Sequence, residues 1–177
     1  TVSPPARADQ ARAIEGETVV GIEATAYLRR GRDLFRVTVI GGADPIHYSN
    51  TYILEADLGW TGVAIELDPE LAGRHVRARR NPCLIADATA VDYSALLDAR
   101  SASHRLAYLS VDIDPAHQSL NSLARIPLGQ FTFAVVTFEH DAYRGGSHVR
   151  RLSRGILRHY GYQLVVGNGQ NVGLPFE

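Results

Sequence analysis

The stretch Leu58-Gly59-Trp60-Thr61-Gly62-Val63-Ala64-Ile65-Glu66-Leu67-Asp68-Pro69 decides the fold. Its apolar part, Val63-Glu66, predicts a buried strand. Asp68 followed by Pro69 predicts the N-cap and first turn of a helix that continues to Arg79. The stretch therefore predicts a strand followed by a helix, which is the unit that builds parallel sheets.

Similar apolar runs recur at spacings of about 20 to 25 residues, with amphipathic segments between them. They predict a Rossmann-like, doubly wound α/β fold with a mostly parallel sheet and helices on both faces. The expected strands are Phe35-Ile40, Val63-Glu66, Pro82-Asp87, Leu106-Asp112, Thr132-Phe138 and Tyr162-Val166. The expected helices are Asn50-Leu58, Pro69-Arg79, Tyr93-Ala99, Gln118-Ile126 and Val149-Tyr160, the last of them stopped by Gly161. Gly167-Gly173 predicts an exposed loop.

Length and composition indicate a single domain over residues 1–177. The chain has 177 residues, 45% of them hydrophobic, which suffices for one sizeable core. We expect an N-terminal helical segment over residues 1–30, with one or two helices in Ala6-Arg30, ahead of an α/β core over residues 35–177. The lack of methionine, even at position 1, and the ending at Phe176-Glu177 suggest a trimmed chain or a fragment of a longer protein. The final strand of the sheet could therefore be missing.

Charge and cysteine content limit the partners. The net charge is -1 and all 18 basic residues are arginines, so no overall field favours nucleic acid or an anionic membrane. Arg150, Arg154 and Arg158 predict one basic stripe on the last helix, read as a solvated face in preference to an anionic-substrate or RNA contact. No apolar run approaches the roughly 18 residues of a membrane span, and no signal peptide is visible, so we expect a soluble protein. The single cysteine, Cys83, suits a reducing cytoplasm.

Acidic residues follow five of the expected strands. They are Asp44, Glu66, Asp87, Asp112 with Asp114, and Glu139 with Asp141. Each one alone is better explained as a turn or helix-cap residue. Because the carboxyl ends of parallel strands share one edge, their recurrence predicts a carboxylate-lined crevice. A ligand with a ribose diol and positive charges would suit such a crevice.

The first loop, Ile40-Gly41-Gly42-Ala43-Asp44-Pro45, separates two cofactor classes. A dinucleotide brings a pyrophosphate, which requires a Gly-x-Gly-x-x-Gly turn at a helix N-terminus. This loop lacks the third glycine and carries a carboxylate and a proline, so a dinucleotide or nucleotide-sugar enzyme is a remote alternative. S-adenosylmethionine has no phosphate, and its ammonium, sulfonium and ribose hydroxyls suit an acidic crevice.

Several motifs together resemble the FkbM-like class I S-adenosylmethionine-dependent methyltransferases. They are Ser49-Asn50-Thr51-Tyr52-Ile53-Leu54-Glu55, then Leu58 to Glu66 with Pro69, then Leu109-Ser110-Val111-Asp112-Ile113-Asp114-Pro115 and Thr137-Phe138-Glu139-His140-Asp141-Ala142-Tyr143. The resemblance covers roughly Phe35 to Glu177. It implies a seven-stranded methyltransferase sheet, S-adenosylmethionine as methyl donor, and hydroxyl groups of small molecules, sugars, polyketides or lipids as acceptors.

The same resemblance implies roles for individual residues. Glu66 would hold the ribose diol, Asp87 the adenine amino group, and Gly41 with its neighbours the methionine part. The complete expected cofactor-binding set is Gly41, Gly42, Asp44, Ser49, Glu66, Asp87 and Asp112.

Two positions of the first loop depart from the family pattern, which reads approximately Asp-Ile-Gly-Ala-x-Asp-Gly. Val39 replaces the first acid and Pro45 the last glycine. The first change removes a carboxylate that organises the loop, and the second fixes φ and removes a backbone donor. We therefore keep two hypotheses: an O-methyltransferase, and an inactive methyltransferase-like domain that serves as a binding or scaffolding module.

Asp112, Glu139 and His140 carry the expected chemistry. Together they would present hard or borderline ligands for Mg²⁺ or Mn²⁺, which lowers the pKa of an acceptor hydroxyl. Without a metal, His140 is the preferred general base, with Asp112 as its catalytic partner and His47 as a competitor. The alternative is that His140 and Asp141 only cap the turn after their strand.

Overall fold

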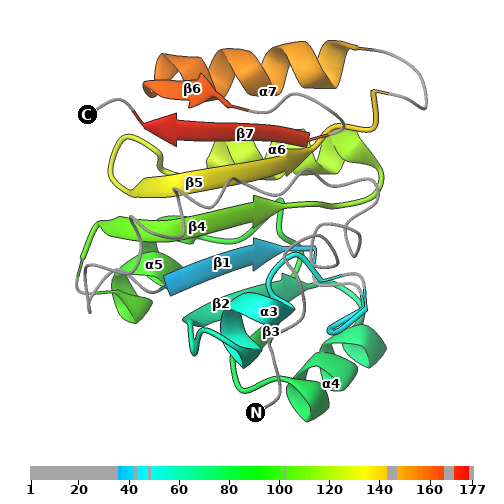
Figure 1. Ribbon diagram of the computed structural model, residues 1–177. Helices are drawn as coiled ribbons and strands as arrows, with labels where there is room; N and C mark the ends of the chain where they lie inside the picture. Colours follow the sequence, from blue (N-terminus) through cyan, green and yellow to red (C-terminus); the bar gives the residue numbers. More distant parts are fainter. Residues whose placement is uncertain are drawn as a thin grey trace, which may run out of the picture.

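One seven-stranded sheet organises the molecule (Figure 1). The computed structural model describes residues 36–41, 44–47, 49–101, 103–142, 147–165 and 170–175, with the backbone alone for 36–39 and 170–175. The strands are β1 (Arg36–Ile40), β2 (Thr61–Glu66), β3 (Cys83–Ile85), β4 (Arg105–Val111), β5 (Thr132–Glu139), β6 (Tyr162–Leu164) and β7 (Gln170–Pro175). Their order is β3-β2-β1-β4-β5-β7-β6, and β7 runs antiparallel to both of its neighbours.

Helices cover both faces of this sheet. They are α3 (Tyr52–Ala56), α4 (Pro69–Ala78), α5 (Tyr93–Arg100), α6 (Ala116–Arg125) and α7 (His148–His159). Figure 1 shows α3 in front of the sheet and α6 behind it. A side-chain cap begins α4, where Asp68 accepts the amides of Glu70 and Leu71. Gly161 follows α7 with φ +85°. The Rossmann-like α/β prediction and these two helix boundaries are confirmed.

The main core lies between the central strands and the layer formed by α5, α6 and α7. Phe138 of β5 and Val111 of β4 are fully buried there. Tyr93 of α5, Leu123 of α6 and Leu157 of α7 belong to the same cluster. This continuous core fixes where β4 and β5 end relative to each other, and therefore the positions of the residues that follow them.

The C-terminal part differs from the sequence prediction. Gly167-Gly173 was expected to be a loop, but Gln170–Pro175 forms β7, which completes a seven-stranded sheet. Gly173 pairs with Val136 on one side and with Leu164 on the other. Hydrogen bonds to two neighbouring strands stabilise a segment whose Gly173, Asn171 and Pro175 give it little strand propensity of its own.

Some predictions lie outside the described residues. They include the N-terminal helices expected in Ala6-Arg30, and Gly42 of the first loop. None of the helices in the described part of the chain has the length and apolar character that a membrane crossing requires.

Candidate functional site

The register of the parallel strands brings four candidate residues into one row. Ile40 pairs with Ile65 of β2 and with Val111 of β4, and Val111 pairs with Phe138 of β5. The next residue on each strand therefore stands at the same carboxyl edge of the sheet. These residues are Gly41, Glu66, Asp112 and Glu139. Asp87 lies farther out, two residues beyond Ile85, the partner of Glu66 on β3.

Gly41 and Asp112 are in close backbone contact. The Gly41 amide donates to the Ile65 carbonyl at 3.2 Å, and the Asp112 amide donates to the Ile40 carbonyl at 2.9 Å. Gly41 has φ +85°, and a Cβ placed on it would lie 1.5 Å from the Asp112 carbonyl oxygen. Glycine is therefore required at this position, where the end of β1 meets the end of β4.

Asp44 serves as a turn residue within the first loop. Its Oδ1 accepts the amides of Ile46 and His47 at 2.9 and 2.8 Å, while Oδ2 forms an ion pair with Arg74 of α4 at 2.7 Å. The two backbone amides, and then Arg74, hold the pKa of Asp44 below its ordinary value despite an opposing desolvation effect. His47, the competing base, lies exposed in the same turn.

Ser49 is held within the protein by Arg79, which follows α4. Nη1 of Arg79 donates to the Ser49 hydroxyl at 3.0 Å, and Nε donates to Glu55 at 2.7 Å. The side chains of Arg79 and Glu55 are only 3% and 6% exposed. Burial raises the pKa of Glu55, but the hydrogen bonds from Arg79 and from the amides of Arg80 and Asn81 outweigh it and leave the pKa lowered. This buried ion pair was not predicted from the sequence.

Glu66 and Asp87 both accept local backbone hydrogen bonds. Oε1 of Glu66 accepts the Asp68 amide at 2.9 Å, so the carboxylate is fixed at the start of α4. Oδ1 of Asp87 accepts both the amide and the hydroxyl of Thr89, at 2.8 and 2.7 Å. These two bonds lower the pKa of Asp87. Both carboxylates are therefore held in fixed positions at the sheet edge.

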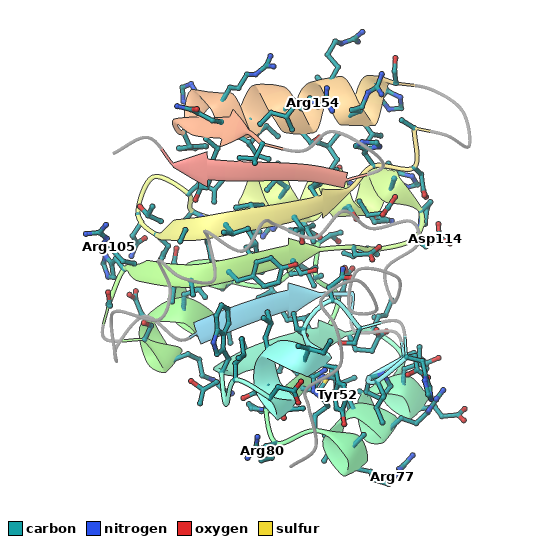
Figure 2. All side chains as sticks on the ribbon, in the orientation of Figure 1. Tyr52, Arg77, Arg80, Arg105, Asp114 and Arg154 are labelled. Carbon is teal, nitrogen blue, oxygen red and sulfur yellow. The ribbon has the colours of Figure 1, made fainter. Side chains whose placement is uncertain are left out.

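Four carboxylates gather where β4 and β5 end. Burial, and then the neighbouring charges of Glu139, Asp141 and Asp114, raise the pKa of Asp112 to about 6. Figure 2 shows Asp114 just beyond the carboxyl end of β4, with Arg105 at the opposite end.

His140 is buried beneath α7 and does not have the geometry of a base. Its ring is 3% exposed, and Nδ1 accepts the Ala142 amide at 3.1 Å. Burial, and then Arg150 and Arg154, lower its pKa, which favours the neutral ring, and a neutral ring whose Nδ1 accepts an amide carries its proton on Nε2. Nε2 has no hydrogen-bond partner among the described residues. With Nδ1 occupied and Nε2 protonated, His140 has no lone pair for a substrate proton.

The predicted metal site at Asp112, Glu139 and His140 is not supported. No group of three His, Cys, Asp or Glu side chains within the described ranges is arranged to hold a metal ion. Instead, Glu139 accepts the Asp141 amide at 3.4 Å, and Asp141 has φ +47°. His140 and Glu139 therefore accept hydrogen bonds from the turn after β5, whereas the alternative interpretation had named His140 and Asp141.

Comparisons with known proteins support the fold. No protein-family model matches the chain, and no curated protein matches it significantly. Among solved structures, the Dnmt2 methyltransferase of S. pombe is similar over 81% of this chain with a TM-score of 0.55 and 13% identity. The match spans only 50% of the Dnmt2 chain. A DUF574 family protein from Streptomyces avermitilis is similar over 87% of this chain and 80% of its own, with a TM-score of 0.50 and 14% identity. The chain thus shares the Rossmann-like fold of a known methyltransferase.

Proposed function

We propose that the protein is an S-adenosylmethionine-dependent O-methyltransferase of the FkbM-like kind, which acts on a hydroxyl group of a small molecule, sugar, polyketide or lipid. The observation that carries the proposal is the row formed by Gly41, Glu66, Asp112 and Glu139. This row crosses the junction of β1 and β4, where the strand order reverses. In open α/β sheets, ligands bind at this switch point.

The acidic sheet edge suits S-adenosylmethionine, because a carboxylate in the loop after β1 disfavours the pyrophosphate of a dinucleotide. The described part of the loop after β1 carries the Asp44 carboxylate, and the fixed carboxylate of Glu66 suits a ribose diol. Asp87 would accept the adenine amino group, and Gly41 with its neighbours would face the methionine part. When bound, S-adenosylmethionine supplies an electrophilic methyl group.

Asp112 is the better candidate for the general base. Its pKa of about 6 lies near neutral pH, where a carboxylate combines availability with basicity. It stands at the switch point, whereas His140 lies beneath α7 with both nitrogens unsuited to accept a proton. We assign Asp112 the role of accepting the proton of the acceptor hydroxyl.

The second candidate function is an inactive methyltransferase-like binding or scaffolding module. This alternative is favoured because two residues that were expected to bind the cofactor make contacts within the protein instead. Asp44 accepts a backbone amide of its own turn and forms an ion pair with Arg74, and the Ser49 hydroxyl accepts a hydrogen bond from Arg79. Together with Val39 and Pro45, these contacts remove some of the polar groups that a cofactor loop would present.

Several finer expectations stay predictions. They are the identity of the acceptor, a small-molecule partner in place of nucleic acid, and a cytoplasmic location. Membership of the FkbM-like family also stays a prediction, which rests on the sequence motifs alone.

The test has two steps. Thermal unfolding is followed with S-adenosylhomocysteine and, as the competing class, NAD⁺; we expect stabilisation by the first alone. The chain is then incubated with S-adenosylmethionine labelled in the methyl group and a panel of hydroxylated sugars, polyketides and lipids. Label transfer supports the enzyme, and binding without transfer to any acceptor favours the inactive module. Stabilisation by NAD⁺ in place of S-adenosylhomocysteine would refute both.

A further inference from the structure

We propose that Arg79 is the positioning residue of the segment that follows β1, and that it holds Pro45, Ser49 and Thr51 in place beside the cofactor site. This inference rests on the proposed function for the identity of the ligand. The positioning role itself rests on the contacts of Arg79.

The guanidinium of Arg79 makes five hydrogen bonds to the loop and to α3. Nη1 donates to the Pro45 carbonyl and the Ser49 hydroxyl, both at 3.0 Å. Nη2 donates to the carbonyl and the hydroxyl of Thr51, both at 3.2 Å. Nε donates to Glu55 at 2.7 Å. All five N–H donors that an arginine has are therefore used, and four of the bonds hold Pro45, Ser49 and Thr51.

Glu55 holds the guanidinium in this position. Oε2 of Glu55 accepts from Arg79 and from Nδ2 of Asn81, and Oε1 accepts the amides of Arg80 and Asn81. Tyr52 adds its ring, whose centroid is 5.5 Å from the Arg79 guanidinium carbon. The pair is buried, so solvent does not screen the attraction between its two charges. Arg79 is thus rigid before any ligand binds.

The position of these bonds in the loop indicates their purpose. Pro45 stands where the resembled pattern has glycine, and its carbonyl is bound directly by Arg79. An arginine fork sets two directions at once, which a single ammonium cannot do. Pro45, Ser49 and Thr51 are therefore held in place before a ligand binds, and the ligand does not have to order them.

Arg79→Lys is the principal test variant, because it keeps the charge beside Glu55 and loses the fork. Arg79→Met combined with Glu55→Gln removes both charges, so that neither is left buried alone. Arg77→Met, an exposed change on α4, is the matched control. Hydrogen exchange of the Ile46 and His47 amides reports the loop, and calorimetric titration with S-adenosylhomocysteine reports the ligand.

We expect both Arg79 variants to fold, with exchange of the Ile46 and His47 amides and the Kd for S-adenosylhomocysteine each raised by about tenfold or more. Amides of β4 and the Arg77→Met control should keep wild-type values. Wild-type loop exchange, or faster loop exchange with an unchanged Kd, would overturn the proposal. A wild-type chain that binds no S-adenosylhomocysteine would instead refute the proposed function, while the exchange rates alone still decide whether Arg79 holds the loop.

Discussion

Replacing Asp112 by asparagine should make the protein more stable above neutral pH. Burial of this carboxyl, and then the neighbouring charges of Glu139, Asp141 and Asp114, raise its pKa from 3.8 to about 6. Between these two pH values the folded protein binds more protons than the unfolded chain, so stability falls as the pH rises. The difference in pKa corresponds to about 3 kcal/mol once Asp112 is ionised in both states.

Asp112→Asn removes this penalty without a large change in shape. We expect it to exceed the wild type in free energy of unfolding by up to about 3 kcal/mol at pH 8 and by about 1.5 kcal/mol at pH 5. Urea unfolding at each pH, followed by the fluorescence of the single tryptophan, Trp60, measures both values. Trp60 is 5% exposed, so unfolding changes its environment.

The control is Asp57→Asn, at an exposed acid that ends α3 outside the cluster. It should show no increase in stability between pH 5 and pH 8. If Asp112→Asn is less stable than the wild type at pH 8, or if its advantage does not grow with pH, then the carboxylates do not repel one another and the acidic edge is wrongly described.

Three further changes test the parts that position the site. Gly41→Ala should cost more than about 4 kcal/mol in urea unfolding, because its Cβ would lie 1.5 Å from the Asp112 carbonyl oxygen; a loss below about 1 kcal/mol would contradict the close contact. Gly155→Ala, in open space on α7, should instead gain about 1 kcal/mol by the same measurement. Asp92→Ala should lose about 1 kcal/mol, because Asp92 caps α5 through the Ala95 amide, and an unchanged stability would exclude that cap.

The sequence was sufficient for the elements whose signals are local. Asp68 with Pro69 predicted the start of α4, and Gly161 predicted the end of α7, because caps and left-handed glycines act on adjacent residues. The row at the sheet edge was also predictable, since the carboxyl ends of parallel strands share one edge. β7 was missed because its stability comes from the two strands beside it rather than from its own residues.

The buried ion pair could not be found by the same reasoning. Arg77, Arg79 and Arg80 follow one another closely, and nothing in the sequence separates the buried arginine from its exposed neighbours. Its partner Glu55 lies on a different helix. One signal was available: an acid in the apolar segment that leads to Trp60 requires a cation if it is buried.

Nor could the sequence distinguish a turn carboxylate from a ligand carboxylate. An acid after a strand can accept the amides of its own turn, as Asp44 and Asp87 do, or face a ligand. The choice depends on backbone geometry that is set by distant contacts. His140 shows the same ambiguity, because its burial and its bond from Ala142 decide whether it can act as a base.

Calorimetric titration of Glu66→Ala with S-adenosylmethionine, beside the wild type, tests the central claim most directly. Glu70→Ala, an exposed change in the first turn of α4, is the control. We expect micromolar binding by the wild type and by Glu70→Ala, and a loss of about tenfold or more in Glu66→Ala, because its carboxylate would hold the ribose hydroxyls. Equal affinity in all three chains, or no binding by the folded wild type, would contradict a cofactor site at this edge of the sheet.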